Sequence, residues 1–172
     1  YLALCLGNPL ENLSKIVSKP GVNILEDNSI EIKTYIRRNK NNREIMEIST
    51  DNGKIAISRF SVKTVYELGK NKKLSLVGCE IETGRTHQIR VHAQLIGCPI
   101  FGDTLYKLRR KEDFIVEKTI LSSFKLKRLR QMLHAHELSF VHPKSGQSIF
   151  LRGELSPDFL NLLSHLEKYK TS

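Results

Sequence analysis

The stretch Glu-Thr-Gly-Arg-Thr-His-Gln-Ile-Arg-Val-His-Ala-Gln-Leu-Ile-Gly occupies positions 82–97 and is followed by Cys-Pro-Ile-Phe-Gly-Asp-Thr-Leu-Tyr at 98–106. Thr86 is a good N-cap, Gly97 is a good C-terminal stop, and Pro99 cannot continue a helix. The pattern therefore predicts about three turns of helix between Thr86 and Gly97. One face of this helix is apolar and should be buried in the core: Ile89, Ala93 and Ile96, with Leu95 beside them.

The N-terminal end of this predicted helix is polar. Arg85, Thr86 and His87 gather where the free backbone N–H groups and the helix dipole favour an anion. Arg90 lies one turn further on, on a flank of the helix. A cation or hydroxyl at this end could meet a phosphate, but many such turns are simply solvated. Spacing alone leaves both interpretations open.

The composition indicates a single basic domain. A chain of 172 residues can bury a real core, and its net charge of +10 and pI of about 9.6 indicate a polyanionic partner. Nucleic acid is the first candidate and an anionic membrane surface the second. There is no apolar stretch of about eighteen residues and no signal-peptide pattern, so we expect no membrane-spanning segment.

The cysteines and histidines do not form a metal-binding pattern. Cys5, Cys79 and Cys98 are isolated and odd in number, which favours a reducing, cytoplasmic location and argues against a zinc site. The pairs His87/His92 and His134/His136 lack a third ligand nearby. We expect neither a metal nor another cofactor.

The rest of the chain reads as strands and a final helix. Residues 1–6 predict a buried strand, residues 30–48 and 54–66 a hairpin turning at Asp51-Asn52-Gly53, and residues 74–81 a further strand. The segment 133–152 predicts a second hairpin, and a helix should start at Ser156. The buried stripe of that helix is Phe159, Leu162, Leu163 and Leu166. The predicted fold is therefore α+β, with a mixed, mostly antiparallel sheet, a central helix and a C-terminal helix.

The stretch between Tyr106 and Arg130 is strongly basic and lacks a clear period. Its cations are Lys107, Arg109, Arg110, Lys111, Lys125, Lys127, Arg128 and Arg130. Two interpretations stay open, a solvated surface and an RNA-facing rim that contacts phosphates.

The quoted motif resembles the signature of the RluA-type pseudouridine synthases, which isomerise uridine within structured RNA. The resemblance rests on positions 82–92, on the run Gly-Cys-Pro-Ile-Phe-Gly-Asp-Thr-Leu-Tyr at 97–106, and on two further segments. These are Asn42-Arg43-Glu44-Ile45-Met46 with Gly53-Lys54-Ile55-Ala56, and the Leu-His-Ala run from Leu133. The sequence of residues 92–100 resembles that of the bacterial enzymes that modify large-subunit ribosomal RNA, the RluC- and RluD-like group.

The resemblance implies roles for particular residues. Arg90 corresponds to the family's catalytic arginine, which keeps a nucleophilic aspartate ionised and oriented. Tyr1, within Tyr1-Leu2-Ala3, corresponds to the tyrosine that lies against the flipped base. Arg85, Thr86, His87 and Gln88 are expected to contact RNA or to shape the site. No metal or cofactor is implied, and the implied partner is RNA, either 23S-type ribosomal RNA or tRNA.

The family's His-Arg-Leu-Asp motif, which carries the nucleophile, does not occur in this sequence. Asp103 belongs to the Gly-Asp-x-Leu-Tyr turn, where it is expected to pin the loop. We therefore expect residues 1–172 to be the C-terminal portion of a catalytic domain, inactive alone, with an exposed sheet edge near residues 2–6. The alternatives are a non-catalytic basic RNA-binding module and a basic structural protein of the ribosome.

Overall fold

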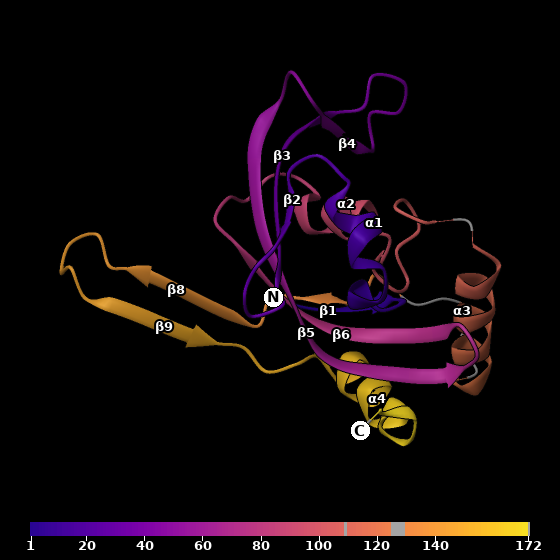
Figure 1. The fold of residues 1–172 in the computed structure, drawn as a ribbon. Coiled ribbons are helices and arrows are strands. Elements are labelled where there is room, and N and C mark those ends of the chain that lie inside the picture. Colours follow the sequence, from indigo (N-terminus) through magenta and orange to yellow (C-terminus); the bar gives the residue numbers. More distant parts are fainter. Residues whose placement is uncertain (109, 125–129, 172) are drawn as a thin grey trace.

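The computed structural model describes residues 1–108, 110–124 and 130–171 (Figure 1). Its strands are β1 (Leu2–Leu6), β2 (Val22–Ile24), β3 (Ile30–Arg38), β4 (Met46–Ser49), β5 (Lys54–Gly69), β6 (Lys72–Ile81), β7 (Leu133–His134), β8 (Glu137–Val141) and β9 (Ser148–Arg152). Its helices are α1 (Leu13–Val17), α2 (Gln88–Leu95), α3 (Lys111–Ser123) and α4 (Pro157–Leu166), with 3-10 turns at Pro9–Asn12 and Glu167–Tyr169. Within the described ranges, no helix combines the length and apolar character that a membrane span requires.

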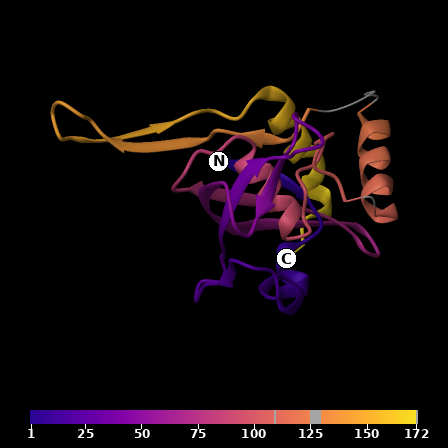
Figure 2. The ribbon, with the colours of Figure 1, turned by 90° about the horizontal axis from the view of Figure 1, so that it is seen from above.

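The main sheet has the order β2-β3-β5-β6-β1-β7, and β4 pairs with β3 beside β2. Every ladder between the described strands is antiparallel. The long strands β5 and β6 form its centre and twist through the molecule (Figures 1 and 2). The predicted α+β class, with its central and C-terminal helices, is confirmed.

The alternation of side chains along β1 divides the core into two layers. Ala3 and Cys5 face one side, where they pack in the same cluster as Ile89 and Ala93 of α2. Leu4 faces the opposite side, in the cluster that α3 and α4 cover. A strand that is apolar on both faces must be covered on both, and this is why β1 reads as a continuous apolar run.

The prediction of an exposed sheet edge at residues 2–6 is wrong. β1 pairs with β6 over its whole length, and on its other side Leu2 and Ala3 pair with β7. Cys5 also forms a bridge with Ile100. Ile100 and β7, which come later in the chain, pair with the side of β1 that we expected to be exposed. This edge therefore lends no support to the idea that the chain is a fragment.

The predicted antiparallel pairing of residues 30–48 with 54–66 is confirmed in part, because Ile30–Ile36 of β3 pair with β5. The turn at Asp51-Asn52-Gly53, however, does not close a hairpin. β4 and β5, on either side of that turn, do not pair with each other, and each pairs instead with β3. The chain therefore crosses the end of β3. Gly53 makes the crossing possible, because it has φ 128° and an added Cβ would lie 2.7 Å from the carbonyl oxygen of Ile36.

The C-terminal elements follow the prediction. β8 and β9 form a two-stranded sheet that extends away from the body (Figures 1 and 2). On one face of this sheet Leu138 pairs with Leu151 and Phe140 with Ile149, and Leu138 and Leu151 are both more than half exposed. In α4 the predicted stripe is confirmed, since Phe159, Leu162 and Leu166 are all buried.

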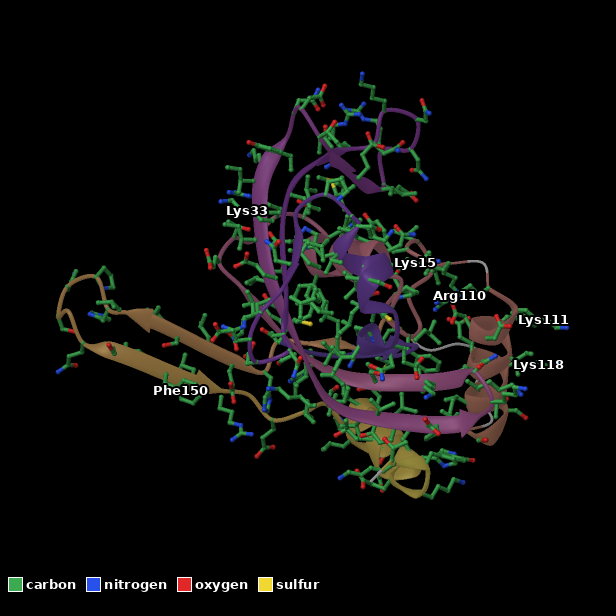
Figure 3. All side chains as sticks on the ribbon, in the orientation of Figure 1. Lys15, Lys33, Arg110, Lys111, Lys118 and Phe150 are labelled. Carbon is green, nitrogen blue, oxygen red and sulfur yellow. The ribbon has the colours of Figure 1, made fainter. Side chains whose placement is uncertain are left out.

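The basic stretch 107–130 is only partly described. Residues 111–123 form α3, on which the side chains of Lys111 and Lys118 are exposed (Figure 3). Arg109, Lys125, Lys127 and Arg128 lie outside the described residues, so the two interpretations of this stretch stay open.

Candidate functional site

Helix α2 begins one residue later than predicted. Its N-cap is His87 in the left-handed conformation (φ 56°), without a side-chain cap, and the expected cap Thr86 is exposed. The end is as predicted: Gly97 has φ 77°, its N–H donates to Gln94, and the N–H of Cys98 donates to Ala93. These two bonds form a Schellman motif, which fixes the direction in which residues 98–106 leave the helix.

Those residues bring Asp103 against Arg90. Nε of Arg90 donates to Oδ2 of Asp103 at 2.6 Å, and Nη2 donates to Oδ1 at 2.8 Å. Oδ1 also accepts the backbone N–H groups of Leu105 and Tyr106, so Asp103 pins its loop as expected. The Asp103 side chain is fully buried and that of Arg90 is 10% exposed. Nη1 of Arg90 forms no hydrogen bond with any described residue.

The pair is electrostatically self-consistent. Burial alone would raise the pKa of Asp103, but the hydrogen bonds from Arg90 and from the backbone outweigh it and lower that pKa below its usual value. The hydrogen bonds that Arg90 donates to Asp103 in turn raise the pKa of Arg90. Both groups therefore stay charged in the protein interior.

Tyr106 links this pair to the start of α2. The Cζ atom of Arg90 lies 4.8 Å from the centre of the Tyr106 ring, a cation–π contact. The Tyr106 hydroxyl accepts the backbone N–H of Met46 at 2.7 Å and lies 2.9 Å from Nδ1 of His87. Burial and the nearby Arg90 charge lower the pKa of His87. His87 is thus disposed to be neutral near pH 7.

Gln88 supports the turn that precedes α2. Its side-chain oxygen accepts the Thr83 hydroxyl and the N–H of Arg85, and its nitrogen donates to the Ile57 carbonyl and the Ser58 hydroxyl. It is 3% exposed, and these four contacts use its full hydrogen-bonding capacity. The geometry therefore suits a positioning role.

His92 occupies a second buried polar site behind α2. Its two ring nitrogens lie 2.9 Å from the Thr34 hydroxyl and 3.0 Å from the Ser58 hydroxyl. Burial lowers the pKa of His92 to about 4, so the ring is neutral near pH 7. His92 thus connects α2 to β3 and β5. No hydrogen bond within the described residues joins His92 to Arg90.

The other predicted site residues lie at the surface. Nε of Arg85 donates to the Ile55 carbonyl at 2.8 Å, and Thr86 is exposed. Tyr1 is 39% exposed and pairs with Cys79 through both backbone hydrogen bonds. Cross-strand partners face the same side of a sheet, so Tyr1 shares the face of Cys79, which α2 covers. No contact within the described residues joins Tyr1 to Arg90.

The sequence did not reveal Asp103 and Tyr106 as the neighbours of Arg90. Their signal was present in the Gly-Asp-x-Leu-Tyr run, but a turn aspartate is commonly a local cap, and only the tertiary structure brings it to α2. Within the described ranges, no group of three His, Cys, Asp or Glu side chains is arranged to hold a metal ion.

Comparison with known proteins identifies the family. Residues 1–95 match the family described as RNA pseudouridylate synthase. Relatives include the RNA pseudouridine synthase YlyB of Bacillus subtilis, 37% identical over 80% of this chain and 39% of the relative, and a Mycoplasma pneumoniae RNA pseudouridine synthase, 32% identical over 96% and 43%. Ribosomal large subunit pseudouridine synthase D of Neisseria meningitidis is 36% identical over 78% of this chain and 34% of its own. The chain thus spans about two fifths of these relatives.

The fold is also found in solved structures. The human RNA pseudouridylate synthase domain containing 1 superposes with a TM-score of 0.61 at 22% identity, covering 94% of this chain and 56% of the human chain. The human domain containing 4 protein gives the same TM-score at 18% identity. These structures show the fold, while the family match over residues 1–95 and the relatives at 36–37% identity show that the chain belongs to the RluA-type RNA pseudouridylate synthases.

Proposed function

We propose that this chain forms part of the catalytic domain of an enzyme that converts uridine to pseudouridine in large-subunit ribosomal RNA. The observation that carries the proposal is the state of Arg90, whose Nε and Nη2 are held by Asp103 while Nη1 remains without a described partner. An arginine oriented in this way can offer one further N–H to a second carboxylate. It would orient that carboxylate and keep it ionised.

The reaction needs such a carboxylate. The bond between N1 of uracil and C1′ of the ribose breaks, the base turns, a bond between C5 and C1′ forms, and the proton on C5 leaves while N1 gains one. An ionised aspartate is a suitable nucleophile for the first step. The sequence contains no His-Arg-Leu-Asp motif. In our proposal the aspartate therefore comes from a further segment of the catalytic domain, and residues 1–172 are inactive alone.

The remaining site residues take supporting roles in this proposal. Tyr1 stacks on the flipped uracil, which its position on the α2 side of the sheet supports. Arg85, Thr86 and His87, at the start of α2, contact the RNA. Gln88 holds their turn from below, since its side chain is buried and fully hydrogen-bonded.

Two alternatives keep the RNA partner but change the role. A tRNA substrate would use the same residues, and a non-catalytic RNA-binding module would keep the surface without the chemistry. The relatives named for the large ribosomal subunit favour ribosomal RNA. The buried Arg90–Asp103 pair favours catalysis, because RNA binding alone does not require a buried arginine held in a fixed orientation by a carboxylate.

The test is release of tritium from RNA labelled at C5 of uridine, measured with residues 1–172 and with the longer reading frame that contains them. We expect release from the longer protein only, and a loss of more than about 100-fold in its Arg90→Lys variant, since lysine cannot bind two carboxylates in the same geometry. Ribosomal RNA and tRNA substrates distinguish the alternatives. Equal activity of the Arg90→Lys variant would refute the role of Arg90.

A further inference from the structure

A hollow of about 380 Å³ lies beside the start of α2, between β3, β4, the first residues of β5 and the turn at 84–86. Four of its lining side chains are cations, contributed by three separate segments. Its lining residues are Ile36, Arg37, Arg38, Met46, Gly53, Lys54, Gly84, Arg85 and Thr86. No carboxylate is among them.

The charges of these cations are mostly uncompensated. Arg37 pairs with Glu47 at 2.8 Å, just outside the hollow. Arg38 and Arg85 donate to backbone carbonyls, of Arg43 and Ile55, which hold the side chains in place without neutralising them. Lys54 makes no ion pair with any described residue. Three positive charges from different segments thus remain around one small space.

Such a space suits a phosphate group. Guanidinium groups present a planar fork of donors that matches phosphate oxygens, and an ammonium group adds a point charge. The hydroxyl of the exposed Thr86 offers a further donor at the rim. Because carbonyl hydrogen bonds already fix Arg38 and Arg85, less side-chain entropy is lost when an anion binds.

The hollow adjoins the Arg90 site. Met46, in its wall, donates its backbone N–H to the Tyr106 hydroxyl, and Arg90 lies over the Tyr106 ring. Thr86, at its rim, is the residue before His87, which also contacts Tyr106. A phosphate in the hollow would therefore lie next to residues that contact the Tyr106 ring on which Arg90 rests.

We propose that this hollow, formed by Arg37, Arg38, Lys54 and Arg85, binds a backbone phosphate of the substrate RNA next to the nucleotide that enters the Arg90 site. The inference rests on the proposed function in taking RNA as the partner. It adds a phosphate subsite made by β3 and β5. The subsite supplies affinity and register and does not read the base.

The test is the affinity of residues 1–172 for a fluorescein-labelled RNA hairpin, measured by anisotropy between 50 and 200 mM salt. We expect Arg38→Ala and Lys54→Ala each to weaken binding about three- to tenfold and to reduce the slope of log K against log salt by about 0.7 to 1. Lys54→Arg should retain both. The control Lys168→Ala removes the same charge from the 3-10 turn at Glu167–Tyr169, which does not line the hollow, and should change neither.

The outcomes separate this inference from the proposed function. If the chain binds RNA but Arg38→Ala and Lys54→Ala behave like Lys168→Ala, the phosphate subsite is wrong while RNA binding stands. If the chain binds no RNA at 50 mM salt, the subsite is also wrong, and tritium release by the longer protein still decides the proposed function. If both alanine variants unfold at the same temperature as the wild type, a loss of RNA affinity is due to the missing cation in the hollow and not to unfolding.

Discussion

Arg90 and Asp103 meet through two parallel hydrogen bonds, of 2.6 and 2.8 Å, with the carboxylate fully buried. Arg130 and Asp158 form a pair of almost the same geometry, at 2.7 and 3.1 Å, but both of its side chains are 42% exposed. The molecule thus contains two arginine–aspartate pairs of similar geometry, one buried and one exposed. Variants of the two pairs can be compared to measure how burial changes the contribution of such a pair to stability.

Asp103→Asn should be strongly destabilising. The amide can still accept the N–H groups of Leu105 and Tyr106, but it leaves the Arg90 charge buried without a counter-charge, and this costs about 3–5 kcal/mol of unfolding free energy. The matched variant Asp158→Asn should cost less than about 1 kcal/mol, because water screens the exposed pair. Urea denaturation measures both. Equal losses would contradict the view that burial makes the first pair important.

His92 should make the protein sensitive to mild acid. Its folded-state pKa of about 4 lies below the ordinary value of 6.5, so protonation favours the unfolded chain. Stability from this group is full above pH 6.5 and falls as the pH drops towards 4, by about 2 kcal/mol between pH 7 and 5.

The measurement is urea denaturation from pH 7 to 4 for the wild type and His92→Gln, which cannot be protonated. The variant is expected to be less stable at pH 7, with a shallower dependence on pH over this range. The ring of His92 should also titrate near pH 4 by NMR. Parallel pH profiles of the two proteins would contradict the assignment.

Gly53→Ala should destabilise the crossing over β3. The new Cβ would lie 2.7 Å from the carbonyl oxygen of Ile36, at φ 128°, and the strain should cost about 1–3 kcal/mol. Gly84→Ala is the control, because an added Cβ there meets no atom within 4 Å. Its stability should stay within about 0.5 kcal/mol of the wild type. Thermal unfolding distinguishes the two, and equal melting temperatures would count against the crossing.

The hairpin of β8 and β9 should open independently of the body. A two-stranded sheet is at best marginally stable, and apart from its base this one has solvent on both faces, including at Phe150, which is 61% exposed (Figure 3). Hydrogen exchange should be at least about 100-fold faster at its amides than in β6. The substitution Leu138→Lys should leave global stability within about 0.5 kcal/mol. Slow exchange in the hairpin would show that it is protected in some other way.

The sequence predicts local structure here better than it predicts pairing. The apolar stripe of α4, the stop at Gly97 and the second hairpin were all readable, because each depends on residues close together in the chain. The pairing of β3 with β5 was also predicted, but the pairing of β4 with β3 was not, since a turn such as Asp51-Asn52-Gly53 closes a hairpin in most contexts. The ladders on both sides of β3, and the close approach of Gly53 to Ile36, show that the turn crosses the end of β3.

In the candidate site, too, single residues could be predicted from the sequence but their long-range contacts could not. Arg90 was readable from the family resemblance, and its helix from periodicity. Its partner Asp103 was assigned only to its own loop, because the bond to Arg90 depends on how the Schellman motif directs residues 98–106. The cap was placed at Thr86, although His87 adopts the left-handed conformation that begins α2. Histidine is enriched among residues with positive φ, but one histidine in a polar turn does not by itself identify such a position.

The position of β1 between β6 and β7 has a consequence for folding kinetics. Its partner in β6 is distant in the chain, with Tyr1 bonded to Cys79 across 78 residues, and its partner in β7 is more distant still. Closing such long loops costs entropy before any contact compensates for it, so β5 and β6 should associate first and β1 should join late. Until then the run Leu2–Leu6 is an unpaired apolar strand, a segment that readily associates with other chains. Refolding yield should therefore fall as protein concentration rises.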